Sequence, residues 1–120
     1  MAKEVLEDHT ERRVHPRYAV NIPVKVDIGN ETIDGLMVDI SIEGLRISVP
    51  SLIKPSTDIL VSFSTEDEVQ ILAHTVWTLE QNLAGLPSYL VGLKINSVRV
   101  NNRDMPGQAE RTAFLDKLLQ

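Results

Sequence analysis

VQILAHTVWTL, residues 69–79, is the longest alternating segment of the chain and decides its fold class. Every second residue in it is apolar or small, namely Val69, Ile71, Ala73, Thr75, Trp77 and Leu79. A period of two places such residues on one face of an extended strand, whereas a helix requires a period near 3.6. We therefore predict a half-buried β-strand whose alternating set faces the core.

Shorter alternating segments lie on both sides of residues 69–79. The other expected strands are Val20–Val26, Glu31–Ile40, Leu45–Val49, Ile59–Phe63 and Tyr89–Ser97. A tight turn at Gly29-Asn30 and loops over 50–57, 65–68 and 81–88 separate them. Pro23 cannot donate to a β-ladder, so we expect the first strand to lie at an edge or to carry a bulge there.

Residues 106–120 follow a different pattern. Ala113, Phe114, Leu115, Leu118 and Leu119 recur at helical spacing. Asp104 is the expected N-cap of this helix, with Pro106 in its first turn. Six short strands followed by one amphipathic helix predict an all-β domain, a small six-stranded antiparallel β-barrel with a C-terminal α-helix. A two-sheet sandwich remains the alternative, although only a barrel removes the exposed sheet edges.

The length of 120 residues fits one domain, which we expect over residues 11–120 after a flexible extension over 1–10. The absence of cysteine excludes disulfides, thiolate metal sites and cysteine nucleophiles. No apolar run approaches the roughly 18 residues of a membrane span, and the start MAKEVLEDHTERR lacks the apolar stretch of a signal peptide. We expect a cytoplasmic protein without membrane insertion.

The charges are unevenly distributed. Twelve basic and 17 acidic side chains give a net charge of −5, but residues 12–26 carry a local charge of +4, which leaves −9 on the rest. A short positive segment in an acidic protein favours a compact anionic ligand over DNA or RNA, which require extended positive surface. A barrel that binds single-stranded nucleic acid is an alternative that the negative charge and 4% aromatic content disfavour.

No catalytic or metal-binding constellation stands out in the sequence. The three histidines, His9, His15 and His74, have neither the spacing of metal ligands nor an accompanying carboxylate cluster. No P-loop, dinucleotide fingerprint or nucleophile elbow occurs. We therefore expect neither an enzyme nor a metal site, and we interpret His74 as a surface histidine.

Two segments carry residues suited to an anionic ligand. The first is Arg12-Arg13-Val14-His15-Pro16-Arg17, where Pro16 disfavours helical backbone at the residue before it. In an extended chain Arg13 and Arg17 project to the same side, roughly 13 Å apart. Guanidinium groups bind phosphate bidentately and stack on, or hydrogen-bond to, guanine. The alternative is a solvated basic linker.

The second segment is Asp39-Ile40-Ser41-Ile42-Glu43-Gly44, between two expected strands. In a binding site, Asp39 would accept from the N1 and N2 hydrogens of a guanine, a donor pair that adenine lacks. Ser41 would donate to a phosphate or base, and Gly44 would let the backbone approach closely. In an ordinary turn, Asp39 and Ser41 would bond backbone amides, and Gly44 would supply a positive φ.

Together these segments resemble the signature of the PilZ domain, a bacterial family of receptors for cyclic di-GMP. The signature is Arg13-x-x-x-Arg17 followed by Asp39-x-Ser41-x-x-Gly44. Residues 73–77 are similar to the family's strand that ends in an aromatic residue, and residues 89–95 to its closing strand with a central glycine. The resemblance covers nearly the whole chain and implies a six-stranded antiparallel barrel with a C-terminal helix.

The resemblance also implies roles for individual residues. Arg13 and Arg17 would lie on a mobile loop that wraps the ligand and orders on binding. Asp39 and Ser41 would recognise guanine and phosphate from the barrel surface, and Gly44 would keep the turn open.

Two positions modify this expectation. An arginine at the place of Arg12 is associated in the family with an intercalated pair of ligand molecules in place of one. Glu43 stands where many members have glycine or another small residue, and a carboxylate there would weaken binding if it pointed inward.

The implied ligand is cyclic di-GMP, with no cofactor, and the signal would pass to an unidentified protein partner in motility, secretion or exopolysaccharide and biofilm control. The partner would dock on residues 11–18 or on the apolar face of helix 106–120, and the chain would act as a monomer or homodimer. The alternative is a PilZ-like adaptor that binds no nucleotide and works by protein contact.

Overall fold

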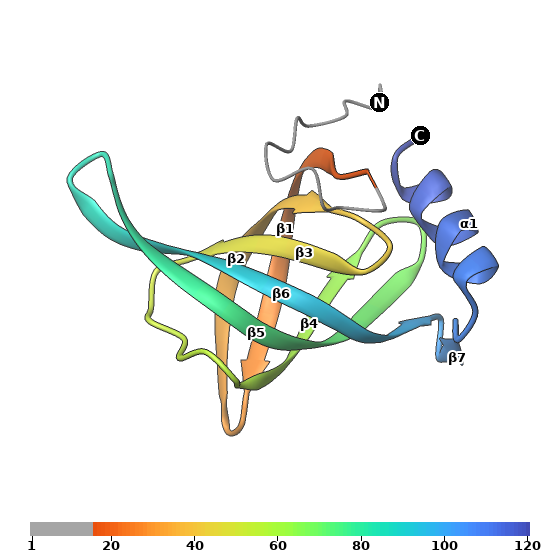
Figure 1. The fold of residues 1–120 in the computed structure, drawn as a ribbon, viewed down its shortest axis with the longest axis horizontal. Coiled ribbons are helices and arrows are strands. Elements are labelled where there is room, and N and C mark those ends of the chain that lie inside the picture. Colours follow the sequence, from red (N-terminus) through yellow and green to blue (C-terminus); the bar gives the residue numbers. More distant parts are fainter. Residues whose placement is uncertain (1–15) are drawn as a thin grey trace.

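The structure, a computed structural model, describes residues 16–120. Its elements are β1 (Tyr18–Ile28), β2 (Glu31–Ile40), β3 (Gly44–Val49), β4 (Asp58–Ser64), β5 (Glu68–Leu83), β6 (Leu86–Val100), β7 (Arg103–Asp104) and α1 (Gln108–Leu118). Figure 1 shows the strands wrapped around a common interior, with α1 beside one end.

The strand pairings close the sheet on itself. The hydrogen-bonded order is β3-β2-β1-β4-β5-β6-β7, and β3 also pairs with β6, so β1 to β6 form a ring. Every pairing is antiparallel. This confirms the expected six-stranded antiparallel barrel, and the two-residue β7 only extends the end of β6.

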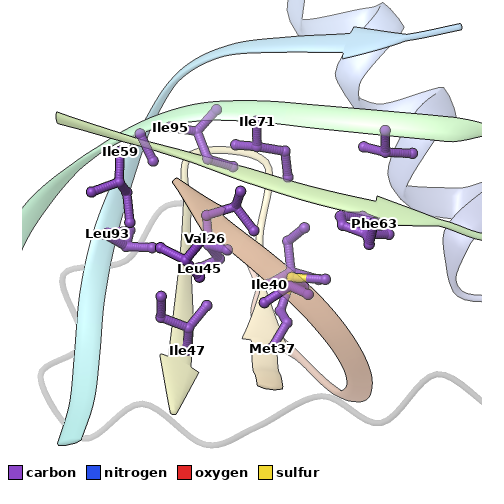
Figure 2. Packing of buried hydrophobic residues seen from close by; sticks show 14 of the residues in the cluster. Val26, Met37, Ile40, Leu45, Ile47, Ile59, Phe63, Ile71, Leu93 and Ile95 are labelled. Carbon is purple, nitrogen blue, oxygen red and sulfur yellow. The ribbon is translucent and has the colours of Figure 1, made fainter. Parts of the chain in front are cut away.

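The inner faces of the strands form an apolar core, which Figure 2 shows from close by. The buried residues include Val26, Met37, Ile40, Leu45, Ile47, Ile59, Val61, Phe63, Ile71, Ala73, Val91, Leu93 and Ile95. Leu115 of α1 and Leu119 after it belong to the same cluster. The apolar side of the helix therefore packs on the barrel, and no helix within residues 16–120 is both long and apolar enough to cross a bilayer.

Pro23 lies within β1 at a place that tolerates a missing donor. The β1–β2 register shifts between Ala19 and Ile22, and the β1–β4 ladder covers only Lys25 to Asp27. Pro23 therefore pairs with β2 on one side and has no β4 partner on the other, as expected for proline at a local edge next to a bulge.

The predicted loop over residues 81–88 is wrong, because β5 and β6 continue through it as a long hairpin. Ala84 and Gly85 form a two-residue turn with φ values of 52° and 81°. Positive φ at both positions is typical of the type I′ turn that joins tightly twisted strands. Figure 1 shows this β5–β6 arm projecting beyond the other strands, on the side away from α1.

The predicted inward face of residues 69–79 holds only as far as Thr75. A register shift between Thr75 and Trp77 inserts one extra residue into β5, so Thr75 pairs with Leu93 and Trp77 with Gly92. Thr75 is buried, whereas Trp77 and Leu79 are exposed. After the bulge, the side chains of the alternating set point to the outer face in place of the inner one. A strict period of two cannot predict this change.

The helix begins later than expected, and Asp104 is not its N-cap. Asp104 lies in β7, where it accepts a hydrogen bond from Nε of Arg99 at 3.0 Å. Gly107 is the N-cap, and its N–H donates to the Glu110 carboxylate at 3.2 Å. Near the other end, Lys117 Nζ bonds Asp67 in the β4–β5 turn at 2.7 Å, which pins the helix to the barrel.

We expect Leu115→Ala to lower the free energy of unfolding by about 2–5 kcal/mol, because it removes a buried side chain between helix and barrel. Urea denaturation followed by circular dichroism measures this change. The matched control is Leu86→Ala, at a leucine that is 69% exposed, with an expected change within about 0.5 kcal/mol. Equal effects of the two substitutions would contradict the packing of α1 described here.

The contact between Lys117 and Asp67 predicts a pH dependence of stability. Hydrogen bonds from Lys117 and Asn101 hold the pKa of the Asp67 carboxyl below its ordinary value. The contribution of Asp67 is therefore complete above the unfolded pKa of about 3.9 and is lost as pH falls through the lower folded pKa. We expect the thermal midpoint of Asp67→Asn to fall less than that of the unsubstituted protein between about pH 5 and about pH 2.5. Parallel curves would contradict this role.

Candidate functional site

Three neighbouring pieces of backbone bring the motif residues together. Arg17 directly precedes β1, Asp39 lies near the end of β2, and Ser41 and Gly44 flank the β2–β3 turn. The β1–β2 register pairs Ala19 with Asp39, so Arg17 falls beside Asp39 although the two are 22 residues apart in the sequence. The pairing of β1 with β2 therefore brings Arg17 and Asp39 close together through the backbone alone.

The carboxylate of Asp39 is the centre of the site. Asp39 is 1% exposed, and its two oxygens are bound by different arginines. Nη1 of Arg17 donates to Oδ1 at 2.5 Å, and Nε of Arg46 donates to Oδ2. A carboxylate buried this deeply is stable only when it is paired and hydrogen-bonded. Two guanidinium groups around one carboxylate leave a net positive charge at the barrel surface.

Arg46 belongs to the site but is not among the residues predicted from the sequence. The β2–β3 register pairs Ile40 with Leu45 and therefore Asp39 with Arg46. Leu45 and Ile47 face the core, so the alternation of β3 turns Arg46 outward. Counting back across the short turn at residues 41–43 is the signal that could have found this cross-strand pair.

Ser41 holds the turn together. Its hydroxyl oxygen accepts from the N–H of Gly44 at 3.1 Å and from the N–H of Glu43 at 3.3 Å. The Ser41 N–H donates to the carbonyl of Gly44 at 2.8 Å. This is the backbone-bonding role expected for Ser41 in an ordinary turn. Glu43 itself is exposed, and its carbonyl accepts from the N–H of Ile95.

Gly44 is required by close packing and not by its backbone conformation. Its φ lies outside the left-handed region, so the positive φ expected for a turn glycine is wrong. A Cβ at this position would lie 2.7 Å from the carbonyl oxygen of Leu93 and 3.6 Å from Nη2 of Arg17. The close approach that the structure shows is between β3 and β6, directly beneath Arg17. The close approach to a ligand stays a prediction.

The site continues across the outer face of the barrel. Ladder pairs connect Ala19, Asp39, Arg46, Gly92 and Trp77 into one row over β1, β2, β3, β6 and β5. A Cβ on Gly92 would lie 2.3 Å from the indole of Trp77, so the ring packs directly on the glycine. Adjacent strands are roughly 4.8 Å apart, and Trp77 of β5 lies two strands from Arg46 of β3. The backbones of these two residues are therefore about 10 Å apart. Cations, a carboxylate and an aromatic ring on one face suit a ligand with phosphates and planar bases.

The remaining predicted residues lie elsewhere or outside the described residues. Arg12 and Arg13 precede residue 16, as do His9 and His15, so the structure does not describe them. His74 is a surface residue, as expected, with Nδ1 2.8 Å from the Asp58 carboxylate. Among residues 16–120, no three potential metal ligands form a group.

The sequence matches the family model of the PilZ domain over residues 11–108. The chain belongs to the PilZ domain family. PilZ domains are regulatory binding domains, and the family is one of cyclic di-GMP receptors. No curated protein matches this sequence.

Two solved structures share the PilZ fold of this chain. The PilZ domain of YcgR from Escherichia coli, solved with cyclic di-GMP, has a TM-score of 0.56 at 13% identity, covering 72% of this chain and 79% of that one. The Bacillus subtilis inhibitor of motility, MotI/DgrA, has a TM-score of 0.60 at 15% identity, over 89% of this chain. This chain spans about half of that protein, 49% of its length.

We expect Gly44→Ala to destabilise this PilZ domain by about 1–3 kcal/mol, because its Cβ would collide with the Leu93 carbonyl. Thermal and urea unfolding measure the change. The control is Gly107→Ala, where a Cβ would meet only the end of the Glu110 side chain at 3.1 Å, and the expected loss is smaller. A fully stable Gly44→Ala variant would rule out close packing as the reason for this glycine.

Proposed function

We propose that this PilZ domain binds cyclic di-GMP at the face formed by Arg17, Asp39 and Arg46, with Arg12 and Arg13 completing the site. The observation that carries the proposal is the Asp39 carboxylate, which is almost fully buried yet bound by two arginines at the barrel surface. Barrel packing alone gives no reason for an ionic cluster at this position, because a well-packed apolar group is often at least as stabilising there.

The chemistry of the cluster matches the parts of the ligand. A carboxylate accepts hydrogen bonds only, and guanine presents two donors, N1–H and the N2 amino group, along one edge. The guanidinium groups of Arg12, Arg13 and Arg17 would bind the two phosphates through paired, charge-assisted hydrogen bonds. A net positive cluster in a chain with a charge of −5 concentrates attraction for an anion at one place.

The proposed signal is an ordering of the arginine segment against the barrel. Arg17 already contacts Asp39 and directly precedes β1. Binding that draws Arg12 and Arg13 to the phosphates would create a new surface at the start of β1. A protein partner in motility, secretion or exopolysaccharide control would bind this surface.

A second candidate function, protein contact without nucleotide, is favoured by the β5–β6 arm. Val76, Leu79 and Leu86 are exposed there, and their apolar side chains offer contact area to a protein partner. The apolar face of α1, by contrast, is occupied by the barrel through Leu115 and Leu119. A partner would therefore dock on the arm in preference to the helix.

We expect Arg13→Ala and Arg17→Ala each to weaken cyclic di-GMP binding by at least about tenfold, because each removes charge-assisted hydrogen bonds. Isothermal titration calorimetry measures the affinity and also the stoichiometry, where two ligands per site would support the role of Arg12. GTP and cyclic di-AMP serve as ligand controls.

Arg99→Ala is the matched protein control, because Arg99 is exposed and pairs with Asp104 at the far end of β6. Its affinity should stay within about twofold of the unsubstituted protein. If the unsubstituted protein gives no heat and no thermal shift with cyclic di-GMP, the receptor proposal fails and the adaptor remains.

A further inference from the structure

The two arginines that bind Asp39 are anchored very differently. Arg17 lies outside the strands, immediately before β1. Arg46 lies within β3, where it pairs with Asp39 of β2 on one side and with Gly92 of β6 on the other. The Arg46 backbone is therefore fixed by a neighbouring strand on both sides, whereas Arg17 lies before the first strand.

The hydrogen bonds show what binding at Asp39 requires. An ionised carboxylate offers about four acceptor positions on its two oxygens. Arg17 occupies one on Oδ1 and Arg46 one on Oδ2. Asp39 is 1% exposed, so a base can reach the carboxylate only after one of the groups bound to it has moved. Departure of Arg17 opens enough positions for two new donors while Arg46 keeps its own.

The charge balance around Asp39 also distinguishes Arg17 from Arg46. A guanine base is neutral, so when it replaces Arg17 it brings donors but no positive charge. A buried carboxylate left without a cation is strongly unfavourable. Arg46 is the cation that stays, and it holds the carboxylate charged and in place for the incoming base.

We propose that Arg46 is the fixed counter-ion of Asp39 and, as a positioning residue, sets the selectivity of the site for guanine, while Arg17 is the exchangeable counter-ion. The inference rests on the proposed function and deepens it. Arg46 acts through Asp39, so its loss should affect recognition of the base more than binding of the phosphates.

The test compares cyclic di-GMP with cyclic di-IMP, in which hypoxanthine lacks the N2 amino donor of guanine. We expect the unsubstituted protein to prefer cyclic di-GMP. Arg46→Gln, which keeps the length and polarity of the side chain but removes its charge, should reduce that preference by at least about tenfold. Arg46→Lys retains the charge and should keep the preference within about threefold of the original. Equal losses for both ligands, or no loss, would overturn the inference.

A second arm protects the test against an unstable variant. In an Asp39→Asn background there is no carboxylate for Arg46 to hold, so adding Arg46→Gln should change cyclic di-GMP affinity by less than about twofold. A further tenfold loss in that background would show that Arg46 contacts the ligand itself and would overturn the inference. Circular dichroism verifies that each variant is folded. An unsubstituted protein that binds neither dinucleotide refutes the proposed function as well, whereas binding with an unaltered preference in Arg46→Gln refutes this inference alone.

Discussion

The pairing of β3 with β6 is the interaction on which the rest of the structure depends. It joins Gly44–Val49 to Tyr89–Lys94 in one antiparallel ladder and converts a six-stranded sheet into a closed ring. Without it, β3 and β6 would each present an unpaired edge, and the inward residues of both strands would lose their cover. The short β3 is therefore paired with β6 along its whole length and with β2 over residues 45–48.

The same ladder places the candidate site. Gly44 begins β3 in direct contact with the Leu93 carbonyl, and any larger residue would push the two strands apart. Two residues later, Arg46 emerges on the outer face between Asp39 and Gly92. The residues that hold the Asp39 carboxylate thus depend on a backbone contact that serves the barrel first. Fold and site share one constraint.

Most of the barrel could be predicted from the sequence, because a period of two is a direct consequence of strand geometry. The features that could not be predicted are those where one residue breaks the period or a turn lacks its usual residues. The extra residue before Trp77 turns that side chain outward, and Ala84-Gly85 forms a tight turn without the Asn-Gly or Asp-Gly signal. Asp104 is not the helix cap, because it pairs with Arg99 in the short β6–β7 ladder.

The proximity of Asp39, Ser41 and Gly44 could be predicted, since a motif within six residues is local in the chain. Their role toward a ligand stays a prediction. The pairing of Arg17 with Asp39 required knowledge that β1 and β2 are neighbours. Prediction of the contact between Arg46 and Asp39 required the exact β2–β3 register across the turn. A register shifted by one residue would place Arg46 on the core face.

The closing ladder also has a consequence for how the protein acquires its activity during folding. The strands it joins are about 40–50 residues apart in sequence, whereas β1–β2, β2–β3, β4–β5 and β5–β6 are neighbours along the chain. Contacts over such separations form late, after the local hairpins. Because Arg46 gains its second anchor only from β6, a chain still emerging from the ribosome would hold the β1–β3 meander without a finished binding face. The proposed binding of cyclic di-GMP would thus require the completed ring, and we expect no binding from a fragment that ends before residue 94.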